Sequence, residues 1–376
     1  MVRVAIIGGK LQGTEAVYLA KKAGFYSVLI DKVENPPAKG MCDDFFQIDV
    51  REKSKLLLHT LKSCDFILPA TENFDALSAL REMQKKYQLK VSFDFEAFEI
   101  SCSKLRSDEL FFKHNIPAPL YYPNGNPPYI AKKAEGSGSE GVRLLAGKSE
   151  VSALLHDDCG GWVVQEYLEG RAYSIEVIGA PGQYKTYQAT EIHVDKDYDC
   201  CLVTCPCPDV NLTAFSNLAI EIAELIQLKG IMDVEAICHD GTLKVLEIDA
   251  RLPSQTPTAV LHSTGVNFLS ELHRLFCGDW VENSGASVFE REKLVAYEHI
   301  YAAADGVELC GEGIMGRCNP LLLHDNLFGA DEVITDYRPR DNTLCATVIN
   351  SADNTELLKK KRQAVWDAVS MRNFYE

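Results

Sequence analysis

Short apolar runs alternate with helical periodicity in the first quarter of the chain. Runs at residues 4–7, 28–30 and 66–69 each have the pattern of a buried strand, and residues 14–23 carry apolar positions at helical spacing. Buried strands that alternate with helices are typical of a parallel sheet. The pattern therefore predicts a parallel α/β domain at residues 1–94, with ligands near the carboxyl ends of its strands.

A different pattern begins after a stretch rich in Pro, Asn and Gly at residues 117–128. The chain then keeps a largely β character from 172 to 215, before a helix predicted at 216–228. A turn at Asp240-Gly241 joins two further apolar runs as a β-hairpin. The strands predicted in this part are 129–132, 142–145, 162–166, 231–238 and 243–248.

These runs divide the rest of the chain into a central region at residues 95–284 and a C-terminal portion at 285–376. The C-terminal portion contains strands and ends in a helix that begins near Thr355. The expected fold class is thus α/β combined with α+β, in which a parallel N-terminal domain is followed by antiparallel sheets.

Composition indicates a globular protein and argues against several partners. Hydrophobic residues make up 46% of the 376 residues, and the formal net charge is −16. Such a charge repels nucleic acid over most of the surface, so nucleic acid is not expected as a partner. No apolar run approaches the ~18 residues of a membrane span, and the scattered cysteines, odd in number at 13, favour a cytoplasmic protein with reduced thiols.

Four acidic residues at the predicted hairpin form the strongest chemical pattern. Asp233 and Glu235 lie two residues apart on one strand, and Glu247 and Asp249 lie two apart on the other. Residues two apart share a face of a strand, so pairing of the two strands brings up to four carboxylates together. Carboxylates next to a phosphate-binding cleft suit Mg²⁺. The alternative is a solvated acidic face.

Basic residues in three places could complete such a site. Arg251 follows the acids and could bind a phosphate or stabilise an oxyanion, unless it only forms a salt bridge with Asp249. Lys132 ends an apolar strand just before a glycine-rich loop at 136–141, whose N–H groups could approach a phosphate. Lys104 lies 28 residues upstream of Lys132, on a segment with helical character.

The glycine loop near the N-terminus departs from a dinucleotide-binding motif. Lys10 occupies the position where the G-x-G-x-x-G pattern requires a glycine, which argues against a nicotinamide cofactor. Lys10, Leu11 and Gln12 are instead expected on the substrate side of a cleft. A second, weaker nucleotide contact through Lys10 and Asp31 stays open.

Taken in order along the chain, these residues resemble the ATP-grasp superfamily, over roughly residues 1 to 280. The order is Lys104, Lys132, the glycine loop, Glu166 to Glu169, Glu235, and Glu247-x-Asp249-x-Arg251. Within that superfamily, the segments 8–13, 192–200, 228–236 and 247–258 are similar to the ligases of pyrrolysine biosynthesis.

The resemblance implies a role for each matching residue in ATP binding. Lys104 and Lys132 would bind the phosphates of ATP, and Glu235, Glu247 and Asp249 would bind two Mg²⁺ ions. Arg251 would lie near an acyl phosphate, with Lys132 as the second catalytic residue. The other implied ATP contacts are Ser137, Gly138, Glu166, Tyr167, Leu168 and Glu169.

The resemblance also implies a reaction. The carboxylate of (3R)-3-methyl-D-ornithine, or D-ornithine, would be activated by ATP as an acyl phosphate, and the ε-amine of L-lysine would capture it as an amide. Glu72 and Asp233 would pair with substrate ammonium groups, and Arg251 with the turn after it would hold a carboxylate. The residues expected to contact substrate are Leu11, Gln12, Glu72, Asp233, Arg251, Ser254, Gln255 and Thr256.

Several alternatives stay open. An ATP-grasp carboxylase, or a ligase for another amino acid, shares the same motifs. A Rossmann-type oxidoreductase fits less well, because Lys10 interrupts the glycine motif. A nucleotide-binding protein without turnover also fits less well, because the predicted metal-binding acids and Arg251 are all present. A homodimer stays open as the quaternary structure. Zinc binding by the cysteines at 200–207 is disfavoured, because the pairs separated by two residues that are typical of structural zinc sites are missing.

Overall fold

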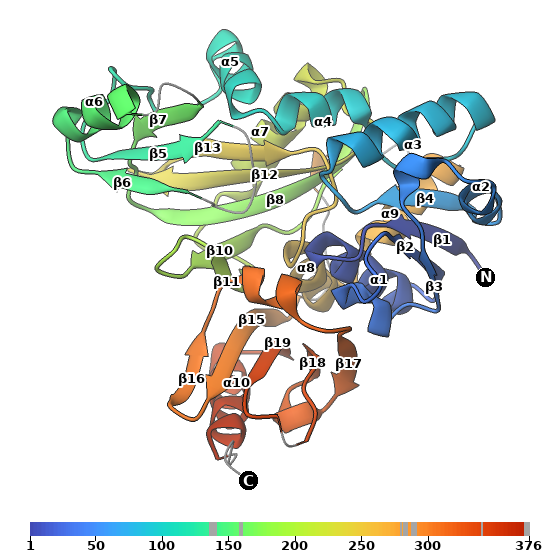
Figure 1. The fold of residues 1–376 in the computed structure, drawn as a ribbon. Coiled ribbons are helices and arrows are strands. Elements are labelled where there is room, and N and C mark those ends of the chain that lie inside the picture. The colour runs from blue at the N-terminus through green and yellow to red at the C-terminus, as the bar shows by residue number, and fades with distance from the viewer. Residues whose placement is uncertain are drawn as a thin grey trace.

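The computed structural model describes residues 1–134, 141–157, 161–278, 280, 285–286, 292–339 and 341–371, and Figure 1 shows their arrangement. A small parallel sheet, a small antiparallel sheet and one large sheet form the architecture. Within these ranges no helix is both long and apolar enough to cross a membrane.

The N-terminal sheet is parallel, as the sequence predicted. Its strand order is β3-β2-β1-β4, and every neighbouring pair is parallel. Its strands are β1 (Arg3–Ile7), β2 (Tyr26–Asp31), β3 (Asp44–Gln47) and β4 (Phe66–Pro69). The helices that accompany them are α1 (Leu11–Lys22), α2 (Lys55–Lys62) and α3 (Phe74–Tyr87). Alternate residues of β1 pack into two different cores, so the strand is apolar throughout because both of its faces are buried.

A three-stranded antiparallel sheet follows two helices, α4 (Phe95–Ser101) and α5 (Lys104–His114). Its order is β6-β5-β7, and it packs against α6 (Lys148–Asp157) through a small core of its own. The strands are β5 (Tyr129–Lys133), β6 (Arg143–Leu145) and β7 (Trp162–Glu166). All three runs were predicted as strands from the sequence.

The large sheet runs in the order β13-β12-β8-β10-β11-β15-β19-β18-β17. The bounds of its strands are β8 (Arg171–Ala180), β9 (Gln183–Thr186), β10 (Thr190–Val194), β11 (Cys200–Cys205), β12 (Gly230–His239), β13 (Thr242–Asp249), β14 (Gly285–Ala286), β15 (Leu294–Ala303), β16 (Gly306–Leu309), β17 (Leu322–Asp325), β18 (Glu332–Thr335) and β19 (Leu344–Ala352). The pairs on this path are antiparallel, which confirms the predicted class of sheet. Because β15 pairs with β11, the C-terminal portion continues the sheet of the central region.

Two of the helices that cover this sheet are α7 (Leu212–Leu225) and α10 (Thr355–Ser370). α7 packs on β8 and β12, and α10 packs on the C-terminal strands. The helix predicted at 216–228 begins earlier because the side chain of Asn211 caps it, accepting from the backbone N–H of Ala214. α10 begins at Thr355, as predicted.

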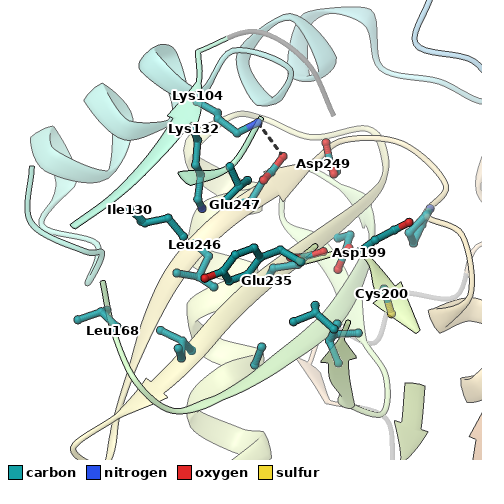
Figure 2. A pocket seen from close by; sticks show the side chains of 18 of the residues that line it. Lys104, Ile130, Lys132, Leu168, Asp199, Cys200, Glu235, Leu246, Glu247 and Asp249 are labelled. Atoms are coloured by element: carbon teal, nitrogen blue, oxygen red, sulfur yellow. Dashed lines mark hydrogen bonds and ion pairs between the residues drawn. The ribbon is translucent and has the colours of Figure 1, made fainter. Parts of the chain in front are cut away.

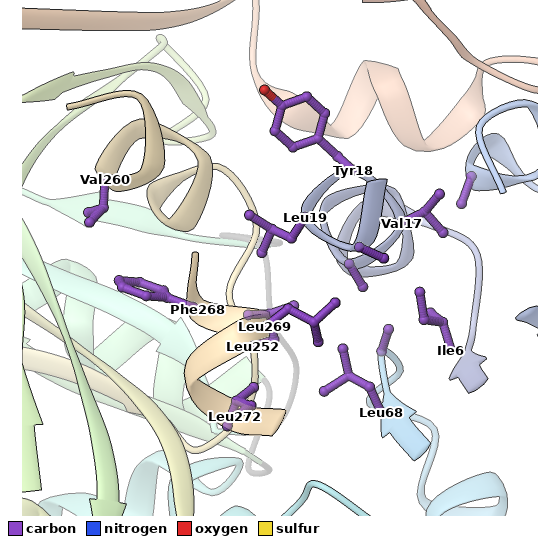
Figure 3. Packing of buried hydrophobic residues seen from close by; sticks show 14 of the residues in the cluster. Ile6, Val17, Tyr18, Leu19, Leu68, Leu252, Val260, Phe268, Leu269 and Leu272 are labelled. Carbon is purple, nitrogen blue, oxygen red and sulfur yellow. The ribbon is translucent and has the colours of Figure 1, made fainter. Parts of the chain in front are cut away.

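The helices α8 (Thr256–Thr264) and α9 (Phe268–Cys277) lie between the large sheet and the N-terminal domain. Figure 3 shows how Leu19 of α1, Leu68 of β4 and Phe268 of α9 meet in one cluster of buried residues. A fully buried side chain of this size contributes about 1.5–3 kcal/mol. The cluster therefore fixes the N-terminal domain firmly against the rest of the molecule. The domain boundaries near residues 94 and 284 stay predictions.

Candidate active site

A cavity of about 420 Å³ lies between the small antiparallel sheet and the large sheet. Ile130 and Lys132 of β5 line it from one side, and Glu235 of β12 and Glu247 of β13 line it from the other. Figure 2 shows these side chains around the same space. The cavity thus collects several of the residues that the sequence predicted for nucleotide and metal binding.

The acidic residues occupy neighbouring positions on the paired strands. Asp233 lies opposite Asp249, and Glu235 lies opposite Glu247, across the hairpin that the sequence predicted. All four line the cavity. The structure therefore gathers the four acids as expected, whereas their role as metal ligands stays a prediction.

Burial and mutual repulsion make these acids reluctant to ionise. Burial, followed by repulsion from Asp233 and Glu247, raises the pKa of Glu235 to about 8. Burial also raises the pKa of Asp249 to about 8, although the charge of Arg251 opposes the rise. A cation placed beside these carboxylates would favour their charged form. The electrostatics therefore fit a cation-binding site.

The acids alone do not form a complete metal cage. Within the described residues, no group of three or more His, Cys, Asp and Glu side chains is arranged to hold a metal ion. Mg²⁺ commonly takes only one or two carboxylates and completes its coordination with water and substrate phosphate. Glu235, Glu247 and Asp249 therefore fit Mg²⁺ that is bound together with a nucleotide.

Two lysines line the cavity next to the acids. Lys104 begins α5, and its Nζ is 3.5 Å from Oε1 of Glu247. Lys132 also lines the cavity, and its charge acts on Glu235. Both lysines therefore lie close to the acids, and their role as phosphate ligands stays a prediction.

The exit of β7 forms another part of the cavity wall. Glu166, Tyr167 and Leu168 line the cavity, but Glu169 does not. The backbone N–H groups of Glu166 and Tyr167 already bond to carbonyls of the protein, at 2.8 Å and 2.9 Å. The N–H groups of Glu166 and Tyr167 are therefore engaged within the protein, and the ATP contacts expected at Glu166 to Glu169 stay predictions.

Lys244 and Leu246 of β13 are two further residues at this site. Lys244 donates to Oε1 of Glu166 at 3.0 Å, and Leu246 lines the cavity. The sequence analysis missed both residues. Both residues lie on the predicted hairpin, which could have pointed to them. The register shift after Glu235 breaks the simple alternation of side chains, so the sequence does not show which of them face the cavity.

Arg251 joins the acids to the N-terminal domain. Its Nη2 donates to Asp249 at 3.0 Å, and its Nε donates to Glu72 at 2.8 Å. Gln12 donates to the same oxygen of Glu72 at 2.6 Å. Arg251 therefore makes the salt bridge that the sequence left open and still lines the cavity. Gln12 and Glu72 are linked to the site through Arg251, because Gln12 bonds to Glu72 and Glu72 bonds to Arg251.

Other residues of the first loop lie outside the cavity. Leu11 packs near Gly316, and Lys10 precedes α1. The carboxylate of Asp31 accepts from the backbone N–H groups of Gly9 and Val33, at 2.7 Å and 2.8 Å. These bonds give Asp31 a structural role in its own loop, and its predicted nucleotide contact stays a prediction.

The turn at Ser254–Thr256 lines the cavity beside Arg251. Thr256 N donates to the carbonyl of Ser254 at 2.9 Å, and Gln255 between them has φ 72° and ψ −58°. This γ-turn with a positive φ is rare and strained, at a cost of about 1–3 kcal/mol. Buried contacts hold it, because Cys200 donates to Gln255 at 2.9 Å.

A buried carboxylate from α1 supports the helix that follows this turn. Oε1 of Glu15 accepts from the backbone N–H and the hydroxyl of Thr258, at 2.8 Å and 2.7 Å. Burial raises the pKa of Glu15 to about 7. Glu15 thereby satisfies free donors in the first turn of α8.

Glu312 is a cavity residue that the sequence analysis missed. It accepts from the hydroxyl of Ser254 at 2.8 Å and begins a 3₁₀ helix, Glu312–Arg317. Asp195 and Asp199 accept from the backbone N–H groups on either side of it, at 3.0 Å and 2.9 Å. The segment 192–200, singled out from the sequence, therefore positions Glu312. Cys200 belongs to the same network, and no metal cluster forms within the described part of 200–207.

Two predicted residues cannot be placed. Ser137 and Gly138, expected in the phosphate-binding loop, lie outside the described residues. The remaining predicted contacts with substrate, Asp233, Ser254, Gln255 and Thr256, all line the cavity.

Comparisons with known proteins agree with this geometry. Residues 102–255 match the model of the ATP-grasp domain family. The chain is 40% identical, over 85% of both sequences, to a protein of Methanosarcina acetivorans named 3-methyl-D-ornithine–L-lysine ligase. The fold of this chain resembles that of N5-carboxyaminoimidazole synthetase from Staphylococcus aureus complexed with ADP, with TM-score 0.71, 16% identity and 97% of each chain covered.

The fold of this chain also resembles that of the dimeric biotin carboxylase domain of 2-oxoglutarate carboxylase from Hydrogenobacter thermophilus, in complex with MgADP and bicarbonate. That TM-score is 0.74 at 14% identity, over 96% of this chain and 89% of the other.

Proposed function

Since the chain belongs to the 3-methyl-D-ornithine–L-lysine ligases of the ATP-grasp superfamily, we propose that it joins these two amino acids through an amide bond. ATP would activate the carboxylate of (3R)-3-methyl-D-ornithine, or D-ornithine, and the ε-amine of L-lysine would displace phosphate. The observation that carries this proposal is the position of the four acids and Arg251, which meet the two lysines in one cavity.

The nucleotide would occupy the side of the cavity near β5 and β7. Ile130, Leu168 and Leu246 offer an apolar wall for the adenine. Lys104 and Lys132 would bind the phosphates as cations. Glu235, Glu247 and Asp249 would hold two Mg²⁺ ions, which supply charge neutralisation at the phosphates.

Arg251 lies where the two substrates would meet. Its guanidinium is planar, permanently charged and 13% exposed, so it can donate to a carboxylate before the reaction and to the developing negative charge during it. Glu72 and Asp249 fix its orientation. Positioning and charge stabilisation would supply most of the rate, because the acyl phosphate is itself reactive towards an amine.

Mass spectrometry of the products tests the proposal. The purified protein would receive ATP and Mg²⁺, with D-ornithine and L-lysine together or separately. We expect an amide product and ADP when both amino acids are present. ADP release that needs bicarbonate but neither amino acid would refute the ligase and favour the carboxylase.

We also propose that the protein works in the cytoplasm as a homodimer. Its many reduced thiols suit a reducing compartment. The related biotin carboxylase domain described above forms a dimer. Light scattering on the purified protein would give the mass of a single 41.8 kDa chain if the dimer is wrong.

A further inference from the structure

Two cysteine thiols meet where the 3₁₀ helix that carries Glu312 packs against the large sheet. Cys318 directly follows this helix, Glu312–Arg317, and Cys345 lies on β19. The two thiols are in hydrogen-bond contact. Both side chains are half-buried and pack against the same apolar core. Two thiols that are distant in the sequence therefore connect the 3₁₀ helix with the sheet.

The two cysteines are not held equally. β19 pairs with β15 on one side and with β18 on the other (Figure 1), and Thr335 donates to the carbonyl of Cys345 at 2.6 Å. Cys318 caps a short 3₁₀ helix, and it contacts that helix through its N–H, 3.3 Å from the carbonyl of Met315, and its thiol, 3.6 Å from the carbonyl of Ile314. A force that draws the two sulfur atoms together would therefore move Cys318 and the end of its helix rather than β19.

The contact also makes the two thiols chemically unequal. The hydrogen bond from Cys318 lowers the pKa of Cys345, whereas the same bond, together with burial, raises the pKa of Cys318. Cys345 therefore carries the larger share of thiolate, which is the form that attacks an oxidant. Cys318 is the neighbouring thiol that can complete a disulfide.

A metal site fits these thiols less well. Asp336 lies close enough for its charge to act on both of them. Over the described part of the chain, however, no three His, Cys, Asp or Glu side chains are arranged to hold a metal ion. A structural zinc site needs four ligands. The pair is therefore better suited to oxidation than to metal binding.

We propose that Cys318 and Cys345 form a redox-sensitive pair, which a hydroperoxide converts to a disulfide, and that this disulfide weakens the binding of an amino acid in the cavity. The Cys345 thiolate attacks one oxygen of hydrogen peroxide, which forms a sulfenic acid and releases hydroxide that takes up a proton to become water. The thiol of Cys318 then attacks the sulfenic sulfur, and a second water leaves. In total, two thiols lose two electrons and two protons, and one peroxide becomes two waters.

The disulfide would act on the cavity through the 3₁₀ helix. A disulfide holds its sulfur atoms about 2.05 Å apart, closer than two hydrogen-bonded thiols, so the end of the helix must shift towards β19. Glu312 at the other end lines the cavity and accepts from Ser254 at 2.8 Å. A misplacement of about 1 Å in an active site can cost on the order of 100-fold in activity. This effect rests on the proposed function, whereas formation of the disulfide does not.

Peptide mapping by mass spectrometry tests the disulfide. The reduced protein would be treated with hydrogen peroxide, alkylated and digested with trypsin without a reductant. Cys310, Cys318 and Cys345 fall on three different tryptic peptides. We expect the peptides of Cys318 and Cys345 to be joined and to separate with dithiothreitol. Failure to find this bridge would overturn the proposal, and so would a bridge from Cys345 to Cys310, a thiol that precedes the same helix and acts electrostatically on Cys345.

Kinetics test the effect on the cavity. ADP release would be measured before and after oxidation, with D-ornithine, L-lysine and ATP varied in turn. We expect KM for one amino acid to rise about tenfold and to recover with dithiothreitol, while KM for ATP stays within about twofold. Unchanged amino-acid KM values in a protein whose disulfide has been mapped would overturn the switch.

Serine variants show whether this pair is responsible. Cys318→Ser and Cys345→Ser should each keep the activity of the reduced wild type and lose the response to peroxide. The matched control is Cys64→Ser, which changes another half-buried thiol, one that donates to the carbonyl of Thr60 at 3.5 Å, and should respond as the wild type does. A response that persists in both variants of the pair would come from another cysteine and would overturn the proposal.

The outcomes separate the inference from the proposed function. A wild-type protein that releases no ADP with any diamino-acid pair would overturn the proposed function. The peptide map would still decide whether Cys318 and Cys345 form the disulfide, because it does not depend on turnover.

Discussion

The pH dependence of stability should reveal the charge state of Glu15. Its buried carboxylate has a pKa raised from 4.5 to about 7, chiefly by burial. A carboxylic acid with a raised pKa in the folded state stabilises the fold below pH 4.5, and this contribution is lost as the pH rises through 7. The shift of about 2.5 pKa units corresponds to roughly 3 kcal/mol.

The substitution Glu15→Gln isolates this effect, because glutamine keeps an oxygen for Thr258 but carries no charge. The contributions of titrating groups that do not interact with Glu15 cancel when the two unfolding free energies are subtracted. Between pH 5 and pH 7, we expect the wild type to lose up to about 1.4 kcal/mol per pH unit relative to the variant.

Urea unfolding followed by tryptophan fluorescence at pH 5, 6, 7 and 8 gives the required free energies. The control is Glu271→Gln, whose carboxylate in the wild type pairs with Arg274. For this control, we expect the wild type to be more stable than Glu271→Gln at every pH measured. Parallel stability curves for Glu15→Gln and the wild type would show that Glu15 is ionised throughout and would refute the reasoning.

Two further substitutions test the site itself. Glu247→Gln should lower the rate of ADP formation by about 100-fold while the unfolding temperature stays unchanged, because a proposed Mg²⁺ ligand is lost; near-normal turnover in a coupled ADP assay would contradict this role. Gly311→Ala would place a Cβ 2.2 Å from Oδ2 of Asp199, so the segment that carries Glu312 must move, and KM for an amino acid should rise about tenfold. Gly147→Ala, which meets nothing within 4 Å, is the matched control and should behave as the wild type in the same kinetic assay.

The sequence was most informative where local rules decide the structure. Asp240-Gly241 fixes a hairpin, and the period of two along its strands then places Asp233 with Glu235 and Glu247 with Asp249 on one face. The parallel N-terminal sheet was predictable because its strands are apolar on both faces. The short β3 (Asp44–Gln47) was missed because its residues are only partly buried and two of the four are polar.

Contacts between distant segments could not be predicted. The alternation along β8 places Glu176 on one face, but only the fold shows that Asp233 lies beside it. Glu312 enters the cavity from the C-terminal portion, more than 50 residues after Ser254, to which it bonds. The bonds from the backbone of Gly9 and Val33 to Asp31 likewise depend on how the folded loop is shaped and were not predicted from the sequence.

The cluster shared by α1, β4, α8 and α9 limits how this enzyme can be recombined with its relatives. Leu19 and Leu68 would be exposed if the first 94 residues were made alone, and so would Phe268 and Leu269 on the part left behind. Chimaeras that exchange this segment should therefore be insoluble unless the two helices are exchanged with it. The N-terminal domain has its own parallel sheet, but part of its hydrophobic core is completed by α8 and α9.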